Sequence, residues 1–173
     1  HGEKVTLYSR GVYQHDSAFK APIFRGTDAV TLFIAVPALL VALWVYLRDG
    51  LRARIFLTGV LGYFLYNSAS LALGAAYNPL LLVYIAAASA SLYAFILAYR
   101  SIDLDELARR STAGFPRIWT VVFLGLGGLS LVIWIVDIVG SLVQGTVPAN
   151  LDSYHTEVTY VIDLAVLLPA VYL

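Results

Sequence analysis

The distribution of apolar residues along the chain constrains its fold more than any other feature. Five mainly apolar segments follow one another with short polar connections, at residues 29–47, 55–76, 80–99, 118–143 and 157–173. Each is close to the length of about 20 residues at which a helix crosses a bilayer. Charged residues make up only 13% of the chain, so a soluble bundle would lack the charges that its surface needs. The sequence therefore predicts an all-α, polytopic transmembrane helix bundle with five spans, or six in a longer protein.

The first 27 residues differ from the rest of the chain. Residues 1–27 are polar and of mixed charge, and their glycine and proline residues interrupt any long regular element. We expect 1–27 to form an extracytoplasmic arm and 28–173 to form the transmembrane helix bundle. Asp28 then stands at the start of the first span, as a helix N-cap. The chain does not begin with Met and is still apolar at Leu173, so we expect the native protein to continue beyond it.

Arginine residues in the connections predict the orientation of the bundle. The loop at 48–54 contains three arginines and the loop at 100–117 contains four, whereas the other two connections contain no lysine or arginine. By the positive-inside rule both arginine-rich loops are expected to be cytoplasmic, with the arm outside a bacterial or archaeal inner membrane. The basic residues of the arm weigh weakly against this orientation. Within the second loop, Asp103 and Glu106 are spaced as a capping box at the start of a short amphipathic helix.

Two aspartates interrupt the fourth and fifth apolar segments. Asp137 and Asp163 each lie six residues from the expected outer end of their span, which places both at a depth of about 9 Å. An ionisable residue inside a span costs a few kcal/mol and by default marks a pathway, a proton relay or a pairing site. We therefore predict an outward-facing acidic pocket. Its expected ligand-binding residues are Asp137, Asp163, Asn67, Glu157, Tyr160 and Tyr84.

Three physical states fit such carboxyl groups, because no lysine or arginine lies inside an expected span. The carboxyl groups can be protonated and hydrogen-bonded, since burial and a neighbouring carboxyl both raise a carboxyl pKa. They can hold a cation together with amide and hydroxyl oxygens. They can also face a partner subunit that supplies positive charge. The alternative to a shared pocket is a pair of aspartates with separate structural hydrogen bonds.

Histidine residues offer a weaker prediction of a metal site. His15 is followed by Asp16, and His155 follows Asp152 in the loop before the fifth segment. These side chains are expected on the outer side and have the chemistry to bind zinc or copper. Solvated surface histidines are the alternative explanation.

Several activities lack the residues that they need. The chain has no cysteine, which excludes thiol chemistry and iron–sulfur ligation by this chain. No span contains a histidine or lysine for haem or retinal attachment, and no serine–histidine or serine–lysine pair can be assembled at membrane depth. The balanced charge gives no nucleic-acid surface. The sequence identifies no cofactor, and an enzyme is the least favoured class, although an acid pair could transfer protons.

Two functions remain after these exclusions. The first is a multi-pass membrane protein whose outward acidic pocket binds a cation or small solute, for transport or sensing. The second is an accessory or structural subunit of a larger membrane complex, with the lipid bilayer and other membrane subunits as partners. The AAASAS stretch at 86–91 fits the second function, because small residues let a neighbouring helix approach closely. An inverted repeat or a pair of broken helices, which would indicate a transporter, is not evident.

Overall fold

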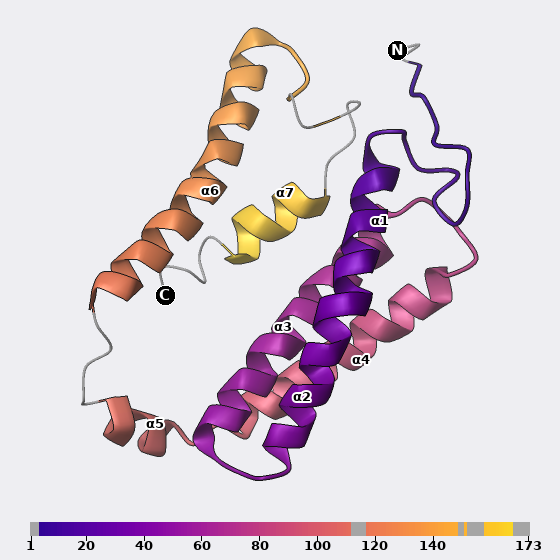
Figure 1. Cartoon of the computed structure of the whole chain (residues 1–173). Helices are drawn as coiled ribbons and strands as arrows, with labels where there is room; N and C mark the ends of the chain where they lie inside the picture. Colours follow the sequence, from indigo (N-terminus) through magenta and orange to yellow (C-terminus); the bar gives the residue numbers. More distant parts are fainter. Residues whose placement is uncertain (1–3, 112–116, 149–150, 152–157, 168–173) are drawn as a thin grey trace. The chain divides into compact units, whose positions relative to one another are not determined.

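The structure is a computed structural model that describes residues 4–111, 117–148, 151 and 158–167. The regular elements of these residues are helices (Figure 1), apart from one isolated antiparallel bridge between Leu7 and Ser17. The chain forms two compact units. One unit comprises Thr6–Thr112, and the other comprises His1–Val5 with Ala113–Leu173.

The first long helix of the Thr6–Thr112 unit begins earlier than the hydropathy pattern predicts. Helices α1 (Lys20–Val30), η1 (Thr31–Ala35) and α2 (Val36–Tyr46) follow without a break. The helix therefore starts at Lys20 rather than at the predicted Ala29. Asp28 lies inside α1, so its predicted role as an N-cap is wrong.

A wider helical turn precedes the proline of this first helix. The π-helical segment η1 ends at Ala35, two residues before Pro37. Proline has no N–H to donate, and its ring collides with the carbonyl of the preceding turn in a regular α-helix. Because a π-turn widens the backbone locally, it lets the helix pass Pro37 and continue to Tyr46.

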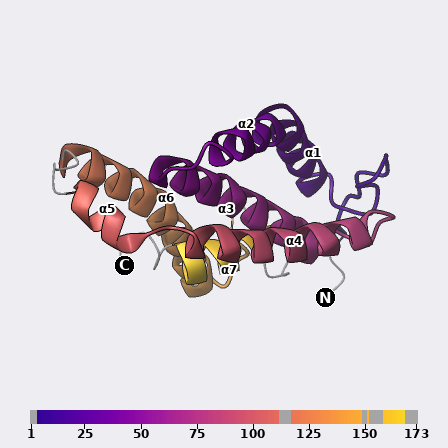
Figure 2. The ribbon, with the colours of Figure 1, turned by 90° about the horizontal axis from the view of Figure 1, so that it is seen from below.

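Helices α3 (Leu51–Gly74) and α4 (Leu81–Arg100) form an antiparallel pair that packs against the first helix. Figure 2 shows α3 and α4 side by side, and it shows that α1 and α2 lie together on one side of α3. Small residues allow this approach: Ala42 is fully buried and Ala98 is 6% exposed, in a cluster with Leu57 and Leu61. Four of the five spans predicted from the sequence thus correspond to long helices in the structure, including the one in the other unit.

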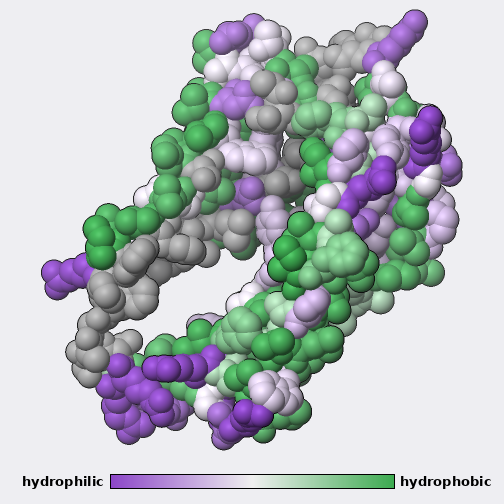
Figure 3. All heavy atoms as spheres, in the orientation of Figure 1, coloured by the Kyte–Doolittle hydropathy of each residue, from purple (hydrophilic) through white to green (hydrophobic). Residues whose placement is uncertain are grey.

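One arginine joins the loops at the basic end of this unit. Arg54 donates one hydrogen bond to the Asp49 carboxylate at 2.7 Å and another to the Ser101 carbonyl oxygen at 2.8 Å. It therefore ties the α2–α3 turn to the end of α4. The short helix α5 (Leu104–Ser111) follows, and the Asp103 carboxylate accepts the Glu106 N–H at 2.9 Å. This bond is the Asp103 half of the predicted capping box, while the Glu106 carboxylate pairs with Arg110. Figure 3 shows hydrophilic side chains gathered at α5 and the α2–α3 turn, and hydrophobic ones over the long helices.

The second unit contains α6 (Arg117–Gln144), α7 (Val158–Ile162) and η2 (Asp163–Leu167). In the whole described chain, four helices are long and apolar enough to cross a membrane: Lys20–Tyr46, Leu51–Gly74, Leu81–Arg100 and Thr120–Gln144. The predicted fifth span at 157–173 is represented by the ten residues 158–167, and the rest of it lies outside the described residues.

Candidate functional site

The predicted acidic site begins with a contact between α6 and α7. The Tyr160 hydroxyl donates a hydrogen bond to the Asp137 carboxylate across 3.1 Å. The Trp134 ring, one helical turn before Asp137, meets the Tyr160 ring edge to face with 4.4 Å between the centroids. Residues three apart share a helix face, so this face of α6 presents an indole and a carboxylate to the same tyrosine. The structure thus brings two of the predicted site residues together.

The second aspartate lies on the helix that carries Tyr160. Asp163 is 7% exposed and Tyr160 is 5% exposed, and their spacing of three residues puts both on one face. Asp163 is also the first residue of η2. Single π-turns inside helices are frequent at functional sites. Asp137 and Tyr160 are thus in contact, and Asp163 is buried on the same helix as Tyr160, while Glu157 lies outside the described residues.

The other two predicted site residues belong to the Thr6–Thr112 unit and have partners there. Asn67 is buried and donates to the Thr31 hydroxyl at 3.0 Å, which also shares a hydrogen bond with the Tyr63 hydroxyl at 2.9 Å. Tyr84 is buried and donates to the Tyr13 hydroxyl at 3.3 Å. Tyr63 and Asn67 of α3 thus contact the first helix at Thr31, where η1 begins.

The predicted metal ligands do not assemble in the part of the chain that the structure describes. No group of three or more His, Cys, Asp or Glu side chains there could hold a metal ion. Asp16 is buried and accepts the Ala76 N–H at 2.8 Å, whereas His15 is exposed and contacts Gln14. Asp152 and His155 lie outside the described residues.

Because α1 begins at Lys20, the part of the predicted arm that precedes it comprises the described residues 4–19, and this segment is called the arm from here on. The arm is folded onto the ends of α1, α3 and α4. A turn at 9–14 with left-handed Ser9 and Gly11 brings Leu7 opposite Ser17. The hydrogen bond from Ala76 to Asp16 then fastens this hairpin to the α3–α4 connection. Burial raises the pKa of the Asp16 carboxyl above its usual value, and the Ala76 amide and nearby positive charge offset this only in part.

A tyrosine at the centre of the arm joins three elements. Tyr13 is 4% exposed, and its hydroxyl donates to the Asp28 carboxylate of α1 at 2.8 Å while it accepts from Tyr84 of α4. Its ring also contacts Phe24, with 5.3 Å between the centroids. Burial, followed by the bonds to Tyr84 and Asp28, raises the pKa of Tyr13 well above its usual range. The phenol therefore stays protonated and keeps its proton on the bond to Asp28.

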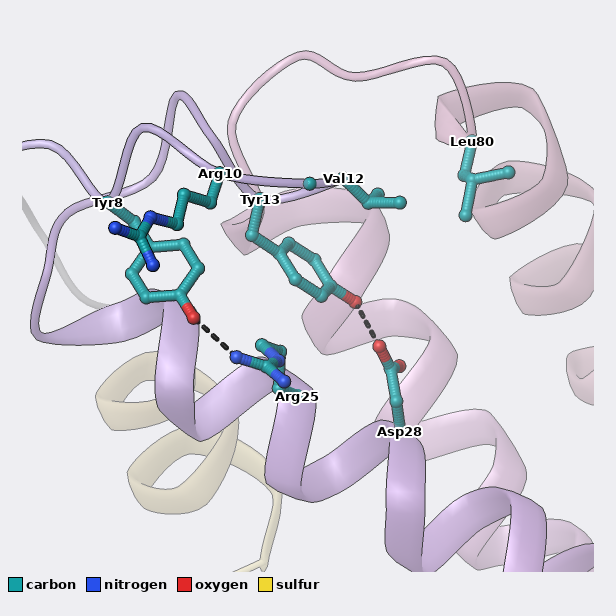
Figure 4. Close-up of a pocket in the computed structure, with 8 residues that line it drawn as sticks. Tyr8, Arg10, Val12, Tyr13, Arg25, Asp28 and Leu80 are labelled. Carbon is teal, nitrogen blue, oxygen red and sulfur yellow. Dashed lines mark hydrogen bonds between the residues drawn. The ribbon is translucent and has the colours of Figure 1, made fainter.

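A pocket of about 350 Å³ opens between the arm, α1 and the start of α4. Figure 4 shows Tyr8, Arg10 and Arg25 at one end of it, and Asp28 with Leu80 at the other. The Tyr8 hydroxyl accepts a hydrogen bond from Arg25, whose guanidinium also lies over the Tyr8 ring, 5.9 Å from its centroid. A volume of this size is at the lower limit for small-molecule sites.

Reasoning from the sequence missed this pocket. The sequence predicted the arm to be an extramembrane segment whose only candidate site was a metal site at His15 and Asp16, and it predicted Asp28 to be a helix cap. The available signal was the alternation of tyrosine and arginine with Gly11 in the segment LYSRGVY at 7–13. Hydrogen bonds that join the arm to residues 60 and 71 positions away are what turn that segment into a pocket wall.

The chain was also compared with known proteins. No known protein family, curated protein or solved structure matches it. The local chemistry of its residues therefore carries the functional conclusions.

Proposed function

We propose that the chain is a multi-pass integral membrane protein that binds a cation or small solute at the acidic site of Asp137, Tyr160 and Asp163. The single observation that carries this proposal is the hydrogen bond from Tyr160 to Asp137, which joins the aspartate of α6 to the helix that bears Asp163. The length and apolar character of the four long helices support insertion into a membrane.

The cost of burying carboxyl groups supports a functional role for the site. An aspartate at the centre of a spanning helix costs about 2.5–3.5 kcal/mol on insertion scales. A bound proton or a bound cation lowers this cost, because either removes negative charge from a region of low dielectric. Carboxylate and phenol oxygens together suit a hard cation.

Substitution of the two aspartates tests this proposal. The Asp137→Asn and Asp163→Asn variants keep the shape of the side chains but remove the charge. Purified wild-type protein and variants would be titrated with Na⁺, Mg²⁺ and Ca²⁺ in turn, and bound metal measured by native mass spectrometry and elemental analysis. We expect stoichiometric binding of one of these cations by the wild-type protein, lost in both variants.

Asp105→Asn is the matched control, because Asp105 is an exposed aspartate of α5. It should bind as the wild-type protein does. Binding that survives in the double variant Asp137→Asn/Asp163→Asn, with the protein still inserted, would refute the proposal for cations. A small solute remains as the occupant only if uptake or solute binding is lost in the same double variant.

A second function, that of an accessory subunit in a membrane complex, is favoured by one specific observation. Ala86, Ala87 and Ala90 of α4 are exposed, on a helix whose other face packs against α3. Small exposed residues suit close packing with a helix of another chain. Native mass spectrometry of protein gently extracted from its own membrane should then show a stoichiometric partner. Ala87→Phe should release that partner, whereas Leu82→Phe, on an exposed residue that is already large, should retain it.

A further inference from the structure

We propose that the pocket between the arm and α1 binds a phosphate group, through Arg10 and Arg25. This site is separate from the acidic site of the other unit, and it makes the folded arm a receptor for a phosphate ester. The phosphate could belong to a lipid headgroup or to a free phosphate ester, because both present the same oxygens to the two guanidinium groups.

The positive charges that line the pocket favour the binding of an anion. Among the residues that the structure describes, no carboxylate forms an ion pair with Arg10 or Arg25. Arg25 is instead held by the Tyr8 hydroxyl and ring, neither of which neutralises it. Arginine presents a planar fork of donors that matches phosphate oxygens in pairs. Two such forks at one end of a cavity form a ready site for a phosphate.

The residues at the other end of the pocket favour a phosphate ester over inorganic phosphate. Asp28 lines this end, and one oxygen of its carboxylate accepts a hydrogen bond from the Tyr13 hydroxyl. A carboxylate there repels a second negative charge but accepts a hydrogen bond from a hydroxyl or ammonium group. Val12 and Leu80 supply apolar contacts beside it. The pocket thus fits a phosphate ester whose far end bears a hydroxyl or an amine, such as glycerol phosphate or phosphoethanolamine.

Exposure of the charged residues supports the position of this site at the membrane surface. Arg25 and Asp28 are both exposed side chains of α1, and charged groups on a spanning helix are disfavoured against hydrocarbon. This part of α1 therefore fits the level of the lipid headgroups, given the membrane insertion proposed above. A phosphate ester is the dominant anion at that level.

The test uses the whole chain, purified in detergent with its residual lipid removed. Binding of sn-glycerol 3-phosphate, phosphoethanolamine and inorganic phosphate would be measured by isothermal titration calorimetry. Binding of phosphatidylglycerol and phosphatidylethanolamine would be measured by native mass spectrometry. We expect at least one ester to bind more tightly than inorganic phosphate. Arg10→Gln and Arg25→Gln should each weaken it by about tenfold or more, because each removes charge-assisted hydrogen bonds.

Two further variants separate a lost site from a lost fold. Leu80→Trp keeps every charge and fills the cavity, so it should also abolish binding. Arg52→Gln removes an exposed arginine at the opposite end of α3 and should bind as the wild-type protein does. Helix content from circular dichroism should be equal in all variants.

The outcomes identify the source of the phosphate or reject the site. Binding of the soluble esters identifies a free solute, and retention of lipid without binding of the soluble esters identifies a headgroup. Either result supports the proposal if it depends on Arg10 and Arg25. Equal binding by the wild-type protein and the double variant Arg10→Gln/Arg25→Gln, or no binding of any of these probes, would overturn it. Neither result bears on cation binding at Asp137 and Asp163.

Discussion

Tyr13 should contribute more to the attachment of the arm than any exposed tyrosine, and Tyr13→Phe measures that contribution. The substitution keeps the ring contact with Phe24 but removes the hydroxyl that donates to Asp28 and accepts from Tyr84. A hydrogen bond to a charged group contributes about 1.5–3 kcal/mol. Asp28 is exposed and can regain water, so the lower end of that range applies. The long 3.3 Å bond from Tyr84 adds about 0.5 kcal/mol, for a total near 2 kcal/mol.

Amide hydrogen exchange is the assay, because it reports local opening separately from global unfolding. A loss of about 2 kcal/mol should accelerate exchange of arm amides such as those of Tyr8 and Ala18 by about 30-fold. Tyr84→Phe removes only the weaker bond and should accelerate it by about two- to threefold. Tyr77→Phe, at a side chain that is 80% exposed, should leave it unchanged. If Tyr13→Phe exchanges no faster than Tyr77→Phe, the tyrosine network does not hold the arm.

Three further perturbations follow from single contacts. Because burial raises the pKa of Asp16, the folded arm binds protons more tightly than the unfolded one. The contribution of Asp16 to the stability of the arm should therefore be greatest below pH 3.8, the usual value, and be lost as the pH rises through the raised value. Asp16→Asn, whose amide oxygen can still accept the hydrogen bond from the Ala76 N–H, should abolish this pH dependence of arm exchange, and its persistence would exclude Asp16 as the cause. Thr31→Val should lower the stability of the Thr6–Thr112 unit by about 1 kcal/mol, seen as a lower melting temperature. Thr31→Ser, which keeps the hydroxyl, should leave the melting temperature unchanged. Asp103→Ala should accelerate amide exchange in the first turn of α5, because it removes the carboxylate that accepts the Glu106 N–H; unchanged exchange across α5 would show that the cap is dispensable.

The long helices could be predicted from the sequence because their signal is local. Apolar runs that end at glycine, asparagine or arginine predicted α3, α4 and α6 to within a few residues of their observed bounds. The start of the first helix was missed because Lys20 to Asp28 reads as polar. Ala21, in that stretch, is fully buried in a cluster with Tyr13, Leu71 and Tyr84. Tertiary contacts with the arm therefore extend the helix beyond its apolar part.

The two candidate sites likewise differ in how far the local sequence predicts them. The prediction that grouped Asp137, Tyr160 and Asp163 rested on the equal depth of the two aspartates on adjacent antiparallel helices, and the hydrogen bond from Tyr160 to Asp137 agrees with it for that one pair. Asn67 and Tyr84 were assigned to that site from depth alone, and depth does not determine which neighbour a side chain faces. The arm pocket depends on contacts that Tyr13 and Asp16 make with residues far along the sequence, and the local tyrosine and arginine pattern at 7–13 does not predict those contacts.

The length of the first helix has a consequence for how the protein responds to its bilayer. Its 27 residues span about 40 Å at 1.5 Å per residue, whereas the hydrocarbon core is about 30 Å thick. In the proposed membrane setting, this mismatch is relieved by tilting or by leaving about two turns outside the core. At the Lys20 end those two turns carry Arg25, and Asp28 follows directly after them. A thicker bilayer would draw these charges toward hydrocarbon, so membrane thickness itself would act on the arm.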